Sequence, residues 1–409
     1  MTRRRRPALA ALGALALALL IAAPAIGQSR NPGERPAENS VEAGLWAEAD
    51  KAELVSRRSA AHIDDDALNA YMKDVACSVA PEYCSEIRIY IMERPLFNAT
   101  ASPNGWVEVW TGLLLTASNE AELAAVIGHE IAHFEENHSV EALQAAKRRQ
   151  AAAMALSLGV AVAGAVAIGN TADPSLAGSI ADLTSILIDA TYYSAVAMHF
   201  AYSRENEEEA DRIGLKRLQA AGYDPAAAAD LWRALVDQTG QSEFRSIRMA
   251  GARFSVFNTH PATADRIEAI DRFSQSQNAS GGPKALNRER YRAAIRPHLL
   301  RWLRSDLQRR DWGMTIATVD RLAKANEDLG VLEFIRGEAH RRRNKADDLQ
   351  RAFEAYRAAS GHPDAPPETF RELGDLARKQ GDREVARASY RRYLATTPEP
   401  ADAWLVRET

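Results

Sequence analysis

Three patterns of hydrophobic and polar residues follow one another along the chain. Residues 121–128 are apolar and helix-forming, and Asn119 is placed to cap the start of that helix. Residues 86–93 and 106–110 instead alternate between hydrophobic and polar residues and are rich in β-branched and aromatic side chains, which indicates two strands. We therefore predict an α+β fold that is mostly helical and contains a small β-sheet.

The third pattern is a helical repeat in the C-terminal part of the chain. Residues 274–284 are rich in Ser, Gln and Gly and are interpreted as a linker. Trp404 follows Phe370 by 34 residues, which is the period of a tetratricopeptide repeat, and an earlier unit with three extra residues at its inner turn covers 337–359. We predict that residues 285–409 form such a domain, whose concave face binds protein segments. The other matching positions of the last unit are Leu373, Gly374, Ala377, Ala386, Tyr390 and Pro398.

The N-terminal stretch has the pattern of a secretory signal peptide. Residues 1–27 combine four Arg, an apolar run to Ala23 and small residues at Ala25 and Gly27. An uncleaved membrane anchor is the alternative, because the run is near the lower length limit for a membrane span. Residues 28–40 are polar with Pro and Gly, and they are predicted to form a disordered linker before a domain at residues 41–273.

The overall charge argues against one class of partner. The chain has 51 basic and 55 acidic residues, and without the four Arg of residues 1–27 the balance is 47 against 55. Because nucleic-acid binding needs a basic surface, we expect no nucleic-acid partner.

The candidate chemistry lies in the motif His129-Glu130-Ile-Ala-His133, at the end of the apolar helix. Positions i and i+4 of a helix share a face, so His129 and His133 can direct their imidazoles at one metal ion, with Glu130 beside it. Imidazole nitrogens suit zinc, and a zinc ion with three protein ligands keeps one position open for water. Glu130 is then placed to deprotonate that water for attack on a peptide carbonyl.

A third ligand is expected from residues 202–214. Glu207 and Asp211 share a helix face, so Glu207 is a candidate ligand while Asp211 orients a ligand imidazole through its free N–H. The alternative is an acidic helix face exposed to solvent.

The pattern Ser203-Arg204-x-x-Glu207-x-x-Ala-Asp211 resembles the third-ligand motif of the bacterial membrane-biogenesis zinc proteases related to HtpX and BepA. The resemblance implies a zincin-like metallopeptidase with one zinc ion per chain, bound by His129, His133 and Glu207. It also implies that Arg204 and Asp211 lie beside the ligands. Further matches extend it over residues 50–272; they are Asn98-Ala99, residues 103–114, 137–139, 259–261 and Arg266.

Two further roles rest on this resemblance. Asn98, Ala99 and the strand at 106–110 would supply an edge on which a substrate backbone pairs as an added strand; a plain edge strand is the alternative. In the BepA-like proteins a His at the position of His260 approaches the zinc ion, which implies a fourth ligand or a transition-state donor. A helix-capping surface His is the alternative for His260.

A long apolar segment separates the two halves of the predicted site. Residues 151–169 are almost wholly apolar, and residues 176–201 are apolar with scattered polar positions. A transmembrane hairpin is one interpretation, but three glycines interrupt the first half and Asp182 and Asp189 interrupt the second. We favour helices that cover the site and touch a membrane surface.

The chain contains only two cysteines, Cys77 and Cys84. After export they would meet an oxidising compartment, so we predict a disulfide between the helix at 68–75 and the strand that follows it. Two cysteines are too few for a thiol metal site.

Together these features predict a zinc endopeptidase that degrades misfolded or stalled envelope proteins in the periplasm. Its expected partners are unfolded clients and, through the repeats, the outer-membrane assembly machinery. A chaperone or scaffold with a latent zinc site is the second interpretation. A transmembrane protease is the third, and it requires residues 151–169 to span a membrane.

Overall fold

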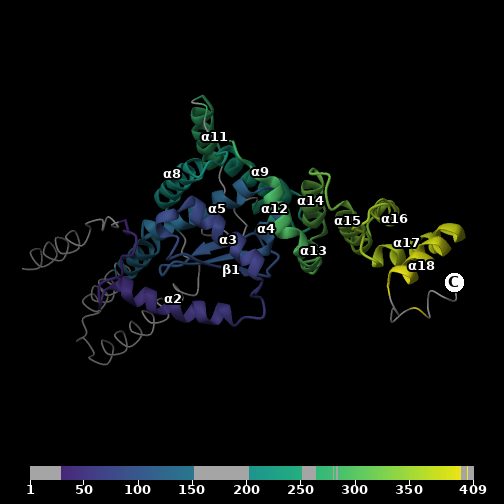
Figure 1. Ribbon diagram of the computed structural model, residues 1–409, viewed down its shortest axis with the longest axis horizontal. Helices are drawn as coiled ribbons and strands as arrows, with labels where there is room; N and C mark the ends of the chain where they lie inside the picture. Colours follow the sequence, from purple (N-terminus) through teal and green to yellow (C-terminus); the bar gives the residue numbers. More distant parts are fainter. Residues whose placement is uncertain are drawn as a thin grey trace, which may run out of the picture.

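The computed structural model describes residues 29–151, 202–250, 264–279, 281, 284–397 and 403. These residues form an elongated molecule, in which a compact part containing the sheet continues into a row of paired helices (Figure 1). The predicted signal peptide, most of the apolar segment 151–201, His260, Pro398 and Trp404 lie outside the described residues. In the described part of the chain, no helix has both the length and the apolar character needed to cross a membrane.

The sheet has three strands, β1 (Arg88–Met92), β2 (Ala99–Ala101) and β3 (Trp106–Trp110), in the order β1-β3-β2. β1 runs parallel to β3, whereas β2 is antiparallel to it. The prediction that Trp106–Trp110 forms an edge is therefore wrong, because β3 is paired on both sides. The edge next to the candidate site is the three-residue strand β2, which is too short to produce a visible alternation in the sequence.

Helix α5 (Glu120–Glu135) lies at the centre of the compact part, and fourteen of its sixteen residues are buried. The Asn119 side chain accepts a hydrogen bond from the Glu122 backbone N–H, which confirms the predicted N-cap. The sheet lies between α5 and α2 (Val41–Arg57) in Figure 1, and α3 (Asp66–Val79) packs against both α5 and β1. The other elements of this part are η1 (Pro81–Tyr83), α4 (Thr111–Thr116), α8 (Arg204–Ala220), α9 (Ala226–Gly240), α10 (Arg245–Ala250) and α11 (Ala264–Ala279).

The residues before α2 are packed against the end of α5. Arg30 is 3% exposed, lies between the rings of Trp46 and Phe134 and forms an ion pair of 2.8 Å with Glu42. Its backbone N–H donates to the Glu135 carbonyl over 2.7 Å. Arg30 of the predicted disordered linker is therefore packed against the domain, which a polar composition does not reveal. The linker at residues 28–40 otherwise stays a prediction.

The disulfide between Cys77 and Cys84 is confirmed, with the two Cα atoms 4.7 Å apart. Cys77 lies in α3 as predicted, but Cys84 follows the 3-10 turn η1 and not a strand. The bridge therefore closes the turn that leads from α3 towards β1.

The regular elements of the C-terminal part are all helices among its described residues, apart from an isolated bridge between Tyr223 and Ala285. α11 continues to Ala279, so the first residues of the predicted linker 274–284 are helical instead. The helices α15 and α16 form one pair and α17 and α18 another (Figure 1). In both pairs a glycine contacts a tyrosine ring, since a Cβ on Gly337 would lie 2.5 Å from Tyr356 and one on Gly374 would lie 2.5 Å from Tyr390. The helices are α12 (Arg288–Ile295), η3 (Arg296–His298), α13 (Leu299–Leu307), α14 (Trp312–Ala323), α15 (Leu329–Arg343), α16 (Asp348–Ala359), α17 (Glu368–Gln380) and α18 (Arg383–Thr396).

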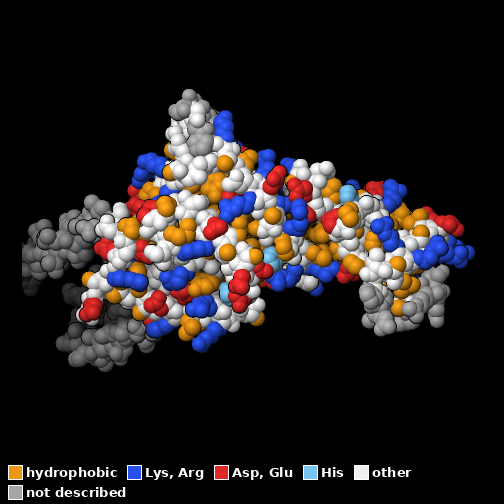
Figure 2. All heavy atoms as spheres, in the orientation of Figure 1, with side chains coloured by type: hydrophobic (Ala, Val, Ile, Leu, Met, Phe, Trp, Pro, Cys, Tyr) orange, Lys and Arg blue, Asp and Glu red, His pale blue; other side chains and the backbone are white. Residues whose placement is uncertain are grey.

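Basic and acidic side chains are intermixed on the face shown in Figure 2, over both the compact part and the C-terminal helices. The predicted limits of the two domains, 41–273 and 285–409, stay predictions.

Candidate metal centre

The candidate site forms where α5 and α8 come into backbone contact. A Cβ on Gly214 of α8 would lie 3.0 Å from the backbone N and 3.1 Å from the Cα of His129 in α5. Gly128, the residue before His129, faces the same point of α8. Because Gly214 carries no side chain, the two helices approach closely enough for side chains from both to meet.

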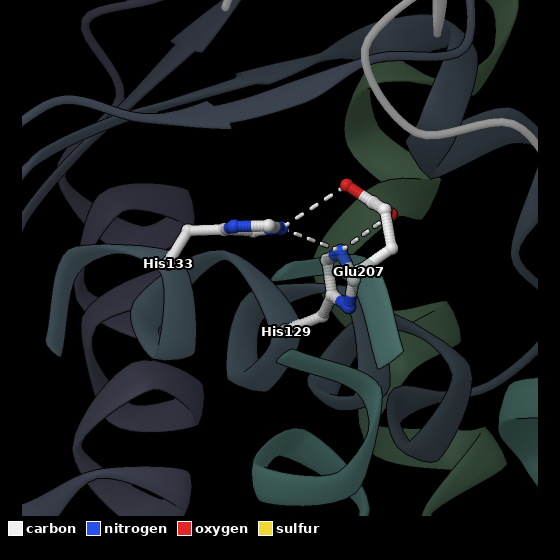
Figure 3. A group of neighbouring side chains, drawn as sticks. All are labelled: His129, His133 and Glu207. Atoms are coloured by element: carbon white, nitrogen blue, oxygen red, sulfur yellow. Dashed lines mark hydrogen bonds and ion pairs between the residues drawn. The ribbon is translucent and has the colours of Figure 1, made fainter. Parts of the chain in front are cut away.

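Three side chains from these helices converge on one point, as Figure 3 shows. The Nε2 atoms of His129 and His133 are 3.0 Å apart, and the Glu207 carboxylate oxygens lie 3.6 Å and 3.5 Å from them. All three side chains are buried. Ligands held about 2.0–2.1 Å from a tetrahedral zinc ion are separated by about 3.4 Å, so this donor set fits a zinc ion. The structure thus brings together the three residues that the sequence predicted as ligands.

The second nitrogen of each imidazole is held by a neighbour. His129 Nδ1 lies 3.0 Å from Asp211 Oδ1, which is the orienting contact that the sequence predicted for Asp211. His133 Nδ1 lies 2.7 Å from Nδ1 of His138. Burial lowers the pKa of His138, so its neutral ring can accept a hydrogen bond from His133. Both contacts leave the Nε2 atoms directed at the centre.

Arg266 of α11 contacts two acidic residues of α8, Asp211 and Glu207. Its Nε and Nη2 each donate to Asp211 over 2.7 Å, and its Nη1 lies 2.9 Å from Glu207. Burial alone would raise the pKa of Asp211, but the Arg266 guanidinium and the hydrogen-bonded His129 hold that pKa well below its usual range. Asp211 therefore stays ionised and can accept from His129.

Arg266 and His138 had appeared in the sequence only as motif matches without a role. Neither could be placed by spacing alone, because Arg266 comes from another helix and His138 lies beyond the end of α5. Arg204, for which a role had been predicted, is exposed at the first position of α8, and that role stays a prediction.

Glu130 is 2% exposed and accepts a hydrogen bond of 3.0 Å from the backbone N–H of Ala101 in β2. Trp110 N donates to Asn98 O and Ser102 N donates to Trp106 O, so the two residues that flank β2 direct backbone groups at the β3 strand. Backbone groups alternate in direction along a strand, so those of Ala99 and Ala101 point away from β3 and towards the side of Glu130. The substrate-binding roles of Asn98 and Ala99 stay predictions.

Tyr202, which the sequence did not indicate as a site residue, packs on a ligand. Its ring stacks on His133, with centroids 4.0 Å apart and planes inclined by 14°. Its hydroxyl lies 3.1 Å from Ser139 Oγ, and burial raises its pKa above the usual value. The stacked ring limits the rotation of the His133 imidazole.

Comparison with known proteins agrees with this site. The profile of peptidase family M48 matches residues 50–274, which is more than half of the chain and includes both α5 and α8. The chain belongs to peptidase family M48. Its members need a bound metal ion, and the chain is accordingly a metalloendopeptidase.

Three relatives show the extent of the similarity. The beta-barrel assembly-enhancing protease of Vibrio cholerae is 31% identical over 208 residues, which are 50% of this chain and 39% of that protein. The protein of the same name in Escherichia coli K12 is 27% identical over 223 residues, 54% of this chain and 42% of that protein. The mitochondrial metalloendopeptidase OMA1 of Schizosaccharomyces pombe is 31% identical over 183 residues, 45% of each chain. The matched regions thus cover less than half of each relative's length.

Proposed function

We propose that this metalloendopeptidase uses zinc, held by His129, His133 and Glu207, and that Glu130 is its general base. The convergence of the three ligand atoms at separations of 3.0–3.6 Å carries the proposal. Two imidazoles and one carboxylate are a donor set typical of catalytic zinc sites, which keep one coordination position open.

The side chains around the three ligands have separate roles in peptide hydrolysis. When bound, the zinc ion polarises the substrate carbonyl and lowers the pKa of water. Glu130 takes a proton from the attacking water and passes it to the leaving amine. The hydrogen bond from Ala101 fixes the Glu130 carboxylate while it does so. Asp211 and His138 hold the imidazoles of His129 and His133 in the tautomer that binds the ion.

The substrates we propose are extended segments of misfolded or stalled envelope proteins. The backbone groups of Ala99 and the carbonyl of Ala101 lie at a strand edge on the side of Glu130, and such an edge recognises main chain with little demand on side chains. Two relatives are named for assembly of β-barrels, which supports outer-membrane proteins as clients. A periplasmic location rests on the signal-peptide pattern of residues 1–27.

The paired helices α15–α18 favour a second, coexisting function as a client-binding scaffold. Their Gly–Tyr contacts recur in both pairs, as expected for tetratricopeptide-like repeats. We propose that this scaffold holds unfolded clients and contacts the outer-membrane assembly machinery, and that it retains chaperone activity when the zinc site is inactive.

One experiment separates the two functions. The variant Glu130→Gln should lose about 10²–10⁴-fold of the rate at which the wild type degrades an unfolded casein-type substrate. It should still bind metal, and it should still suppress aggregation of an unfolded client. Degradation close to the wild-type rate would remove Glu130 from the general-base role, and equal cleavage of folded and unfolded substrates would contradict the proposed substrate class.

A further inference from the structure

A cavity of about 250 Å³ lies where the sheet-containing part meets the first C-terminal helices. Its walls come from the segment 95–97 and from α4, α9, α10, α13 and α14. Of these helices, α4, α9, α13 and α14 are neighbours in Figure 1, and α10 contacts α9. It is separate from the metal centre, since none of the ligand residues lines it.

The described walls are largely apolar and carry little net charge. Leu115, Leu235, Ile247 and Met314 face the space together with the segment 95–97. The one acidic wall residue, Asp306, accepts hydrogen bonds from Arg309 over 2.9 Å and from Thr315 over 2.6 Å. Because this carboxylate is paired with the guanidinium of Arg309, the cavity suits a neutral molecule better than an ion.

One polar group in the wall is left unpaired. Gln238 is 3% exposed, and its Oε1 lies 3.1 Å from Thr116 Oγ1, whereas its Nε2 has no hydrogen-bond partner among the described residues. A buried amide without a partner is destabilising. Turning the amide by 180° would leave Oε1 unpaired instead, so a hydroxyl group, which both donates and accepts, complements either orientation.

We propose that this cavity binds a small neutral apolar molecule carrying one hydroxyl group, of the size of a substituted phenol. Apolar cavities of about 150 Å³ already bind benzene, so the larger volume accommodates a substituted ring. The apolar part of the molecule contacts the leucine, isoleucine and methionine side chains, and its hydroxyl group pairs with the Gln238 amide.

A molecule bound in this cavity affects the metal centre through one wall of the cavity. The segment 95–97 leads directly into Asn98 and β2, whose Ala101 N–H binds Glu130. A molecule in the cavity therefore restrains the chain just before β2. Its effect on peptide hydrolysis rests on the proposed function, whereas binding itself does not.

Binding of p-cresol to the full chain tests the proposal, measured by isothermal titration and by ligand-observed NMR. We expect a Kd on the order of 1 mM, which is far weaker than the affinity ceiling for a ligand of this size. The variant Ile247→Trp fills the cavity from its half-buried rim and should abolish binding. The matched control Met249→Trp adds the same ring to the same helix at a position that is 74% exposed, and it should leave Kd unchanged.

A second pair of measurements tests the role of the amide. Gln238→Leu should weaken p-cresol binding about 3- to 10-fold and leave the binding of toluene, which has no hydroxyl group, unchanged. Hydrogen exchange of the Ala101 amide should slow when p-cresol is bound. Absence of p-cresol binding, or equal binding to the wild type and Ile247→Trp, would overturn the site irrespective of peptidase activity.

Discussion

Among the described residues, the imidazole–carboxylate pairs His129–Asp211 and His340–Asp348 differ in what surrounds them. In the metal centre His129 Nδ1 lies 3.0 Å from Asp211, and in the C-terminal helices His340 Nδ1 lies 3.1 Å from Asp348. The other nitrogen of His129 faces His133 and Glu207, whereas Asp348 additionally binds Arg343 and so joins α15 to α16.

The pKa values of the two imidazoles move in opposite directions. Burial lowers the pKa of both rings, and at His340 it prevails. At His129 the hydrogen bond and charge of Asp211 outweigh burial and raise the pKa. The comparison shows that an imidazole–carboxylate pair indicates a metal site only where the second imidazole nitrogen converges with other donor atoms on one point. Elsewhere the same pair stabilises a helix hairpin.

Asp211→Asn should lower zinc affinity about 10- to 100-fold, because the amide no longer fixes His129 through a charged hydrogen bond. Competition with a chromogenic chelator measures the change. Asp348→Asn is the matched control from the other pair, and it should leave zinc affinity unchanged. Equal affinities in Asp211→Asn and the wild type would show that the contact has no orienting role.

Gly214→Ala should also weaken zinc binding, because it changes the spacing of the two helix backbones. The new Cβ would meet α5 at 3.0–3.2 Å and push the helices apart, which costs about 1–3 kcal/mol of folding free energy and weakens zinc binding. Denaturant unfolding and the chelator assay measure both effects. Gly128→Ala is the control, since its Cβ would meet α8 no closer than 3.5 Å. Identical behaviour of the two variants would contradict the close-contact explanation.

Asp348→Asn should lower the free energy of unfolding by about 1–3 kcal/mol, because buried hydrogen bonds to Arg343 and to the Lys345 backbone N–H lose their charged acceptor. Denaturant titration measures the loss. A drop in peptidase activity at temperatures where the variant is fully folded would contradict a purely structural role for this pair.

The next prediction concerns the disulfide. In the native protein Cys77 and Cys84 should resist alkylation until they are reduced. The double variant Cys77→Ala/Cys84→Ala loses the bridge, which should cost about 2 kcal/mol of folding free energy because the closed loop is short. Its zinc content should be unchanged. Free labelling of both thiols before reduction would exclude the bridge.

The sequence predicted those parts of the site that depend on local spacing. The i,i+4 relation placed His129 with His133 and Glu207 with Asp211, and the N-cap at Asn119 marked where the central helix begins. The contacts of Arg266 and His138 depend on how separate elements pack, so spacing could not reveal them. The prediction of β3 at an edge failed because the strand that pairs with it, β2, has only three residues and is not recognisable in the sequence.

The zinc content of purified protein tests the central claim most directly. Wild type should contain about one zinc ion per chain, whereas folded His133→Ala and Glu207→Ala should each contain only a small fraction of that amount. Glu208→Ala, which changes the exposed neighbour of Glu207 on the same helix, should bind zinc as the wild type does. Full zinc content in His133→Ala or in Glu207→Ala would contradict the assignment of the metal centre.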